Sequence, residues 1–327
     1  MSNILVTGGA GYIGSHACKA LYQRGYTPVT LDNLSTGWKD AVKFGPLEQC
    51  DLRDKFAVDQ IFKRYKPEAV MHFAALSQVG ESISLPGLYW ENNVIGSLSL
   101  IQCAIDNNCR NIVFSSTCAT YGEQDNVLLN ENSNQYPINA YGASKLAVEN
   151  ILRDFELAYG LNYVIFRYFN VAGADKEAEI GEFHQPETHL LPLILNCIEN
   201  KSDALTIFGT DYPTKDGTCI RDYVHVCDLV DAHLLGFEWL LNSKGSRIYN
   251  LGSGTGFSVR EIISKVQQIT KKEVPVIEGQ RRSGDCAKLV SGSIRAINEL
   301  GWQTKRSNLT QIVTDAWRWH RCGGYTE

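Results

Sequence analysis

The stretch Ile4-Leu5-Val6-Thr7-Gly8-Gly9-Ala10-Gly11-Tyr12-Ile13-Gly14 decides the fold of this chain. A short apolar run of strand length leads directly into Gly-x-x-Gly-x-x-Gly, and the residues that follow have helical spacing. The three glycines permit a tight turn and let the backbone approach a pyrophosphate, which would bind against the first amides of the helix. The motif predicts a dinucleotide site that includes Gly8, Gly11, Tyr12, Ile13 and Gly14.

A second apolar run ends at Asp32, about 20 residues beyond the glycines, the spacing expected for a carboxylate that binds the adenosine ribose. Such a carboxylate repels a 2′-phosphate, so the pattern favours NAD over NADP. The alternative is a glycine-rich turn that binds nothing. Further on, Asp51 and Leu52 are candidates to flank the adenine, although Asp51 could instead cap a helix.

Apolar runs of strand length alternate with stretches of helical spacing through the first half of the chain. The strands are expected at residues 4–7, 28–31, 69–73, 111–115 and 163–167. Alternating β and α units require crossover connections and give a parallel sheet that is covered on both faces. We predict an α/β fold with a Rossmann-type doubly wound sheet over residues 1–170.

The second half of the chain predicts a smaller α/β lobe that is interleaved with the first domain. Residues 171–223 are rich in Gly, Pro, Asp, Glu and His, with a helix-like run at 190–198. A helix at 227–241 and a strand at 247–251 are expected to return to the main sheet, so that 224–252 belongs with 1–170. Residues 171–223 and 253–327 form the substrate lobe, with a helix at 259–270, a strand at 274–277 and a terminal helix containing Trp317 and Trp319.

Composition excludes several classes of protein. A chain of 327 residues with 44% hydrophobic and 20% charged residues can bury a large core, which argues against a minimal binding module or global disorder. The net charge of −5 and the scattered Lys and Arg argue against a nucleic-acid surface. Ten cysteines without a Cys-x-x-Cys pair suggest reduced thiols, and no apolar run approaches a membrane span. We expect a cytoplasmic protein without a leader segment or membrane partner.

The sequence Tyr141-Gly142-Ala143-Ser144-Lys145 places a phenol and an ammonium on one face of a predicted helix. A phenol is a poor base at neutral pH, but an adjacent lysine and a nicotinamide cation favour phenolate and lower its pKa. Such a pair can take a proton from an alcohol while hydride leaves the same carbon. Hydroxyls at Ser115, Ser116 and Thr117 follow a predicted strand, at the edge of the sheet where ligands bind.

With these motifs in order, the chain resembles the extended short-chain dehydrogenase/reductase family, and along its whole length the nucleotide-sugar 4-epimerase branch of that family. The matching segments are residues 8–14, 92–93, 115–117, 121–122, 141–145, 167–170, 207–214, 216–218, 221–226, 249–252 and 281–285. The resemblance implies redox-neutral interconversion of UDP-galactose and UDP-glucose with tightly bound NAD. Tyr141 would take the proton of the sugar 4-hydroxyl as the C4 hydride passes to NAD⁺, with Thr117 sharing the hydrogen bond. The 4-keto sugar would then turn its other face for the return of hydride and proton.

The resemblance also implies roles for individual residues and a homodimer. Lys145 would assist catalysis, Asn170, Arg221 and Arg282 would bind the diphosphate, Phe208 would lie against uracil, and Asp285 would bind the uridine ribose. The further cofactor contacts would be Asn33, Phe73, Ala74, Asn92, Ser115 and Tyr168, and the further substrate contacts His189, Leu190 and Leu289. The alternatives for single residues are a surface salt bridge for each arginine and core packing for Phe208.

Three departures from the family pattern keep alternatives open. Ser77 stands where a lysine often reaches the cofactor, and His189 stands where an asparagine binds on the uracil side. Leu289 replaces a bulky tyrosine in the sugar pocket, so activity on the N-acetylated pair, as in a UDP-N-acetylglucosamine 4-epimerase, stays open.

Other functions and metal binding have weaker support in the sequence. Cys118-Ala119 follows Thr117 where dehydratases carry Asp-Glu, which argues against a dehydratase or decarboxylase, and retention of Tyr141 and Lys145 argues against a non-catalytic NAD sensor. No His-Glu-x-x-His spacing is present, so we expect no metal site and interpret His72 as a satisfied strand residue.

Overall fold

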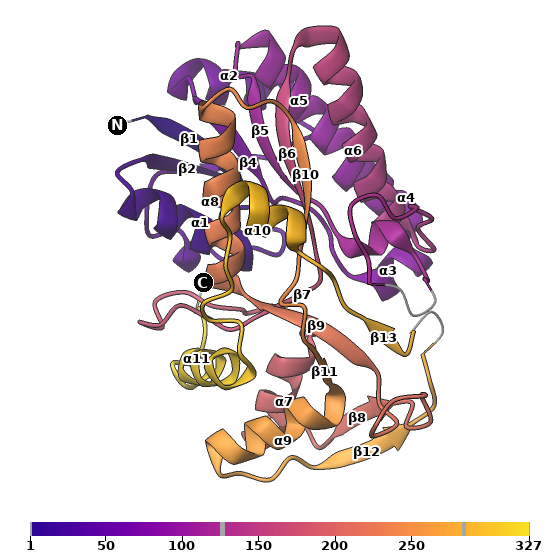
Figure 1. Ribbon diagram of the computed structural model, residues 1–327. Helices are drawn as coiled ribbons and strands as arrows, with labels where there is room; N and C mark the ends of the chain where they lie inside the picture. Colours follow the sequence, from indigo (N-terminus) through magenta and orange to yellow (C-terminus); the bar gives the residue numbers. More distant parts are fainter. Residues whose placement is uncertain (1, 125–127, 283–285, 327) are drawn as a thin grey trace.

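The computed structural model describes residues 2–124, 128–282 and 286–326 (Figure 1). Its centre is a parallel seven-stranded sheet with the strand order β10-β6-β5-β4-β1-β2-β3. The strands are β1 (Asn3–Thr7), β2 (Thr27–Asp32), β3 (Leu47–Gln49), β4 (Ala69–His72), β5 (Asn111–Ser115), β6 (Asn162–Tyr168) and β10 (Arg247–Leu251). This arrangement confirms the predicted doubly wound sheet.

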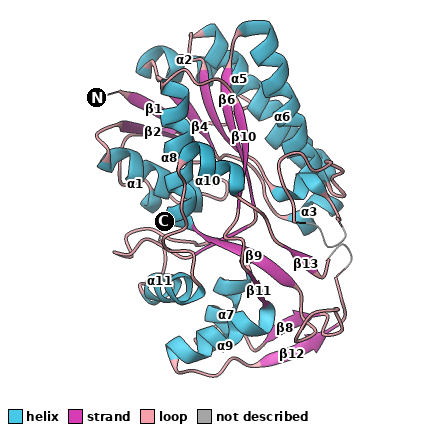
Figure 2. Cartoon of the chain, viewed as in Figure 1, coloured by secondary structure: helices cyan, strands magenta, loops and turns pink. Residues whose placement is uncertain are grey.

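Helices cover both faces of this sheet, as Figure 2 shows. One face is covered by α1 (Tyr12–Gln23), α8 (Val226–Leu241) and α10 (Ile294–Leu300), and the other by α2 (Lys55–Tyr65), α5 (Gly96–Asp106) and α6 (Ala140–Tyr159). Side chains alternate between the two faces: Ile4 and Val6 of β1 pack with the first group of helices, and Leu5 packs with the second. The central strands are mainly apolar because both of their faces are buried, whereas the short edge strand β3 is polar and partly exposed.

Five short helical turns connect the described strands and helices of this domain. Three of them lie consecutively in the long connection between β4 and α5, namely α3 (Val79–Ser84), α4 (Pro86–Tyr89) and the π-helical η2 (Trp90–Ile95). The other two are η1 (Lys39–Ala41) and η3 (Cys118–Tyr121).

The smaller lobe contains a second sheet, in which β9 (Ile220–His225) pairs with β7 (Asn170–Ala172), β11 (Gly256–Ser258) and β13 (Lys288–Leu289). A separate parallel pair is formed by β8 (Leu205–Phe208) and β12 (Val276–Gly279). Three helices pack around an apolar core there, namely α7 (Leu190–Ile198), α9 (Val259–Thr270) and α11 (Leu309–Arg321). The strand predicted at 274–277 begins two residues later, because Pro275 only accepts a hydrogen bond from Leu205 and the paired ladder begins at Val276.

The chain crosses from one lobe to the other and back. Strand β6 ends at Tyr168 and β7 begins at Asn170, so the carboxyl end of the parallel sheet faces the smaller lobe (Figure 1). After β9, helix α8 leads to β10, which pairs with β6 at the edge of the main sheet. The predicted return of residues 247–251 is confirmed. The division into an NAD-binding and a UDP-sugar-binding domain stays a prediction.

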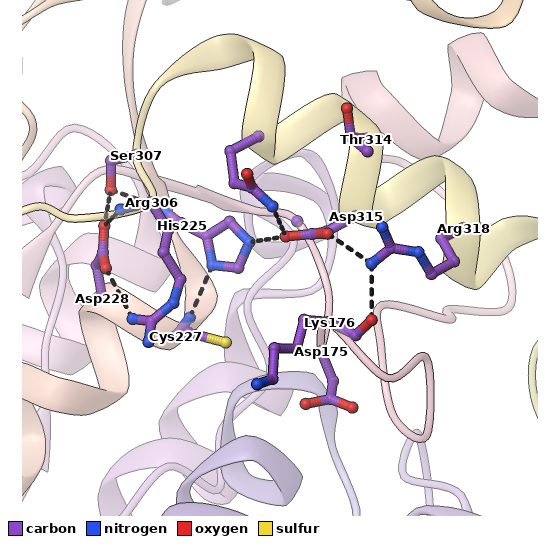
Figure 3. Close-up of polar contacts among 12 residues, drawn as sticks. Asp175, Lys176, His225, Cys227, Asp228, Arg306, Ser307, Thr314, Asp315 and Arg318 are labelled. Carbon is purple, nitrogen blue, oxygen red and sulfur yellow. Dashed lines mark hydrogen bonds and ion pairs between the residues drawn. The ribbon is translucent and has the colours of Figure 1, made fainter.

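Figure 3 shows a buried polar network between the start of α8 and helix α11. The Nδ1 atom of His225 accepts the backbone N–H of Cys227 at 3.1 Å, so its proton lies on Nε2 and is donated to Asp315 at 3.2 Å. Asp315 also accepts hydrogen bonds from Gln311 and Arg318. The network holds the C-terminal helix against the junction of the two lobes. Among the described residues, we find no helix whose length and apolar character would let it cross a membrane.

Candidate active site

The carboxyl end of β5 and the first turn of α6 bring the predicted catalytic residues together. Asn139 caps α6 by accepting the N–H of Gly142 at 2.8 Å, which places Tyr141 in the first turn of the helix. Lys145 follows one turn later, is buried, and donates from Nζ to the carbonyl oxygen of Ser115 at 2.8 Å. A hydrogen bond joins Tyr141 to Thr117. These contacts converge where β5 ends, beside the smaller lobe.

Lys145 is a buried base without a carboxylate partner. Within the described part of the chain it forms no ion pair, and its Nζ lies 5.0 Å from the centre of the Phe114 ring. Burial lowers the pKa of Lys145 to about 7, against the opposing charge of Glu149. The ammonium therefore exchanges its proton near neutral pH.

The protein alone does not lower the pKa of Tyr141. Burial raises the pKa of Tyr141 to about 12, and the hydrogen bond with Thr117 opposes this only in part. We expected Lys145 and a nicotinamide cation to lower it together. In the protein without cofactor, burial of Tyr141 therefore outweighs any lowering by its neighbours. Joint lowering of the Tyr141 pKa by Lys145 and the cofactor charge stays a prediction.

The glycine loop fits a dinucleotide. Gly8 has a φ of +70°, and a Cβ there would lie 2.6 Å from the Ala74 nitrogen. A Cβ on Gly14 would lie 2.1 Å from the Gly8 oxygen, so both positions require glycine. Helix α1 begins at Tyr12 after Gly11, and no side chain caps its first amides. Its backbone donors are therefore suited to an anionic ligand.

The carboxylate at the end of β2 is held by backbone amides. Asp32 is buried, and it accepts the N–H of Ala10 at 3.0 Å on one oxygen and that of Leu34 at 2.9 Å on the other. Burial raises the pKa of Asp32, and these two hydrogen bonds oppose the rise. Each carboxylate oxygen keeps a second lone pair, so ribose hydroxyls can still bind.

The Asp51 carboxylate accepts hydrogen bonds from nearby residues and does not cap helix α2. Hydrogen bonds from Arg53 to both carboxylate oxygens lower the pKa of Asp51, and Asn33 also donates to Oδ2 at 3.1 Å. The cap of α2 is Asp54, which accepts the N–H of Ala57, so the alternative that Asp51 caps the helix is wrong. Its place beside adenine stays a prediction.

The remaining predicted cofactor residues surround the ends of the central strands. Tyr12 donates to the Gly173 oxygen at 2.6 Å, and Tyr168 forms a hydrogen bond with Ser115. The Phe73 ring lies 4.9 Å from that of His233. The other members are Ile13 and Leu52, which pack against the core, Ala74, whose N–H faces Thr7, and Asn92, which donates to Asn93. Ser77, the departure from the family pattern, is exposed.

Asn93 is a positioning residue that the sequence analysis did not assign. Its buried side chain exchanges hydrogen bonds with the backbone of Leu76 and donates to the Ser144 hydroxyl at 3.1 Å. It therefore ties the segment after β4 to the helix that carries Tyr141. The signal was the pair Asn92-Asn93, of which only the first was assigned. His72 is satisfied by Thr7 and Ser97, which confirms its interpretation as a strand residue.

The smaller lobe brings several predicted substrate residues into one sheet. Leu289 of β13 lies opposite Arg221 of β9 in parallel register, and Asn170 of β7 lies opposite Tyr223. Arg221 donates to the Cys286 carbonyl oxygen at 2.8 Å. Burial raises the pKa of Cys118 to about 12, and the charge of Arg221 opposes the rise. Arg221 therefore acts electrostatically on the residue that follows Thr117.

Phe208 and Arg282 form a second pair. The guanidinium carbon of Arg282 lies 3.8 Å from the centre of the Phe208 ring, which is 36% exposed at the end of β8. An exposed aromatic face beside a cation suits a base and an anionic group. Asp285, predicted for the uridine ribose, lies outside the described residues.

His189 and Leu190 start helix α7. Leu190 is partly buried against the core of the lobe. The His189 ring contacts Glu187 at 3.0 Å and Glu182 at 3.1 Å. Burial lowers the pKa of His189, but the two carboxylates outweigh it and raise the pKa to about 9. Its place on the uracil side stays a prediction.

A cavity of about 660 Å³ lies elsewhere, between residues 39–47 and the end of the chain. Its lining includes Lys39, Lys43, Glu179 and Tyr325, and none of the predicted site residues. The convergence of polar side chains at the strand ends, rather than this cavity, therefore identifies the candidate site.

Comparisons with known proteins agree with this site. The pattern of the NAD dependent epimerase/dehydratase family matches residues 4–252. A protein named UDP-glucose 4-epimerase from Rhizobium meliloti (strain 1021) is 47% identical over 319 residues, 98% of this chain and 97% of the relative. The crystal structure of UDP-glucose 4-epimerase from Brucella ovis in complex with NAD has a TM-score of 0.95 and 45% identity, and covers 97% of this chain and 98% of its own.

A third relative contains a bound nucleotide sugar. The UDP-glucose-4-epimerase from Stenotrophomonas maltophila with bound NAD and formylated UDP-arabinopyranose has a TM-score of 0.95 and 38% identity, with 99% of both chains covered. Identity at this level extends over both lobes, which confirms the resemblance found in the sequence. The chain belongs to the NAD dependent epimerase/dehydratase family.

Proposed function

We propose that the protein interconverts UDP-galactose and UDP-glucose by inverting the configuration at C4 of the hexose, with NAD as a tightly bound cofactor. One observation carries the proposal: Lys145 is buried against the end of β5, on the helix turn that follows Tyr141, and Tyr141 is hydrogen-bonded to Thr117. The relatives named above support the substrate pair. NAD supplies the acceptor and later the donor of the C4 hydride when it is bound.

The protein's own part of the reaction is the movement of one proton. Tyr141 takes the proton of the 4-hydroxyl as C4 is oxidised, and it returns that proton when C4 is reduced from the opposite face. Thr117 holds the hydrogen bond to the phenol oxygen. Lys145 supplies an adjacent group that titrates near neutral pH. The proton that leaves the substrate is the one that the product regains, so the cycle is neutral overall.

The smaller lobe would hold the UDP group. Arg221 and Arg282 provide planar donors for the two phosphates, and Asn170 lies on the strand next to that of Arg221. Phe208 presents its exposed face to the uracil, and Asp285 would bind the ribose. Leu289, opposite Arg221 in the sheet, is placed to contact the sugar.

The residue that follows Thr117 distinguishes epimerisation from dehydration. A dehydratase needs a carboxyl group there to donate a proton, and Cys118, with its pKa raised to about 12, is a poor substitute. Activity on N-acetylated UDP-hexoses depends on the space that Leu289 leaves, because an apolar wall discriminates by about 1–3 kcal/mol only.

The test is incubation of the purified protein with UDP-galactose and no added oxidant. We expect conversion to UDP-glucose until the two sugars reach equilibrium, and a parallel incubation with UDP-N-acetylgalactosamine measures the breadth of the sugar pocket. A 4-keto-6-deoxy product would indicate a dehydratase instead. Absence of turnover with bound NAD would indicate a non-catalytic sensor.

We also propose that the protein is a cytoplasmic homodimer. Ten free cysteines suit a reducing compartment. Exposed apolar side chains are concentrated in residues 79–95, which supply a surface for a second copy. They are Val79, Ile83, Leu85, Leu88, Trp90 and Ile95. Sedimentation should give twice the chain mass of 36.4 kDa, and a single-chain mass would contradict the dimer.

A further inference from the structure

Four potential metal ligands lie together in the loop that precedes α7. They are Glu182, His184, Glu187 and His189, and their ligand atoms all lie within 4.8 Å of one another. The side chains of Glu182 and Glu187 are only 7% and 11% exposed, so two carboxylates are buried beside two imidazoles. None of these residues belongs to the reacting group formed by Tyr141, Lys145 and Thr117.

The distances between the donor atoms fit a tetrahedral zinc ion. The Nδ1 atom of His184 lies 3.6 Å from Glu182 Oε1 and 3.7 Å from Glu187 Oε2, and that of His189 lies 3.1 Å and 3.0 Å from Oε1 of the same two residues. Zn²⁺ binds His nitrogen and carboxylate oxygen at about 2.0–2.2 Å, so that two donors of one tetrahedral site lie about 3.3 Å apart. The four histidine–carboxylate separations bracket this value, with a different oxygen of Glu187 facing each histidine. Because the ligand atoms of the cluster are spread over up to 4.8 Å, an ion would draw the four side chains closer together.

The hydrogen bonding of the cluster is incomplete. Nδ1 of His184 is buried and has no hydrogen-bond partner in the described residues, although two carboxylates face it at distances too long for a hydrogen bond. The Glu182 carboxylate is more than nine-tenths buried, and in the part of the chain that the structure describes its only partners are the two imidazoles. Buried polar groups normally find partners, and a cation between these donors would supply one to both residues.

We propose that Glu182, His184, Glu187 and His189 bind one zinc ion. The two carboxylates balance the charge of the ion, and two nitrogen donors favour zinc over calcium or magnesium, which prefer oxygen. All four positions are filled by protein ligands, as in structural rather than catalytic zinc sites. The ion would fix the loop that enters α7. It would also fix the contact of this loop with α11, because Trp319 of α11 donates a hydrogen bond to the Glu182 carbonyl oxygen at 2.9 Å.

The sequence contained a signal that we did not use. His184-x-Pro-Glu187-x-His189 places three donors within one short loop, with Glu182 two residues earlier. We expected no metal site because the His-Glu-x-x-His spacing of helical zinc enzymes is missing. The loop reaches a comparable donor set without a helix, because its turns bring residues two to seven positions apart to one point.

The test is metal analysis of the untagged, full-length protein with its bound NAD. After growth with zinc and dialysis against a weak chelator, we expect about one zinc per chain, and replacement by Co²⁺ should give the visible bands of a tetrahedral nitrogen and oxygen site. A zinc content near zero would overturn the proposal and leave an ion pair between His189 and its carboxylates. A thiolate-to-cobalt band would place the metal on cysteines and overturn it as well.

Variants locate the ion. His184→Ala should weaken zinc binding at least about 100-fold, since a ligand is lost outright. The matched control is His320→Gln, because His320 forms another histidine–glutamate pair of the same lobe, 3.1 Å from Glu199, outside the cluster. The control should keep its zinc. Equal zinc content in both variants would reject the site, whatever the outcome of the epimerase assay, because the readout is metal and not turnover.

Discussion

Helix α6 carries two buried ionisable side chains one turn apart, Lys145 and Glu149. They differ in whether a residue of opposite charge contacts them. Glu149 accepts hydrogen bonds from Arg167 at 2.6 Å and 2.9 Å and from Ser116 at 2.6 Å. Among the described residues, the one hydrogen-bond acceptor of Lys145 is the Ser115 carbonyl oxygen at 2.8 Å. Both side chains are buried, so the difference between them lies in their partners.

The comparison shows what distinguishes a structural charge from a reactive one. Burial lowers the pKa of Arg167, but the hydrogen bonds and charge of Glu149 outweigh it and raise the pKa, so the guanidinium stays charged. Lys145 lacks such a counter-ion, and burial brings its pKa to about 7. A buried group without a partner is therefore poised to exchange a proton, which is typical of a reaction site.

The largest expected effect comes from breaking the paired charge. Arg167→Met removes the buried counter-ion of Glu149 and leaves it with the half-exposed Arg153, whose Nη2 lies 3.4 Å from Glu149 Oε2. We expect the free energy of unfolding in urea to fall by about 3–5 kcal/mol. Replacing Arg167 and Glu149 together with apolar residues should recover most of this loss. Arg64→Ala, which breaks an exposed pair with Glu48, is the control and should reduce the free energy of unfolding far less. A similar loss in both single variants would invalidate the comparison.

The next largest effect is a loss of turnover when Tyr141, one turn before Lys145 on α6, is replaced. Tyr141→Phe removes the proton acceptor and should reduce kcat for UDP-galactose at least about 100-fold, with unchanged thermal unfolding. Tyr136→Phe is the matched control, because its ring is 70% exposed, and it should keep full activity. Near-normal turnover of the Tyr141 variant would remove the phenol from the mechanism.

A third variant tests another buried pair, at the junction of the lobes. Asp315→Ala leaves the Nε2–H of His225 without its acceptor, and the expected loss in unfolding free energy is about 1–3 kcal/mol. Asp231→Ala removes one partner of the half-exposed Arg306 and should have a much smaller effect. Urea unfolding measures both, and equal losses would show that the network adds no stability.

The smallest effect, taken per pH unit, is a change in the pH dependence of stability. The pKa of Lys145 is about 7 in the folded protein and about 10.4 unfolded, so the unfolded chain binds more protons between these values. The free energy of unfolding of wild type relative to Lys145→Met should therefore rise by up to about 1.4 kcal/mol per pH unit from pH 7 to 10, and this gain is lost as the pH falls to 7. The measurement uses protein freed of NAD, and a flat difference would mean that Lys145 stays charged.

Much of the fold was predictable because its signals are local. The alternating strands, the glycine loop and the return of residues 247–251 to the sheet follow from patterns over a few residues, and the structure confirms them. Errors arose where distant residues decide. One example is the start of β12, which depends on its pairing with β8.

The candidate site was predictable in part. Tyr141 and Lys145 share a helix face because of their spacing, and Thr117 meets them because β5 ends there. The neighbours Arg221 and Leu289 lie 68 positions apart and come together only through the pairing of β13 with β9. The role of Asn93 and the cluster around His184 were missed, since each depends on how loops fold against helices.

By itself, the sequence determined the order of α and β units, the glycine turn and the helical spacing of the phenol and ammonium, because these depend on backbone preferences and side-chain period. Only the tertiary structure decided which buried charge is neutralised. Arg167 reaches Glu149 from β6, and no carboxylate reaches Lys145 within the described residues. A pKa depends on solvent and on charges brought close by folding, so it is a property of the assembled protein.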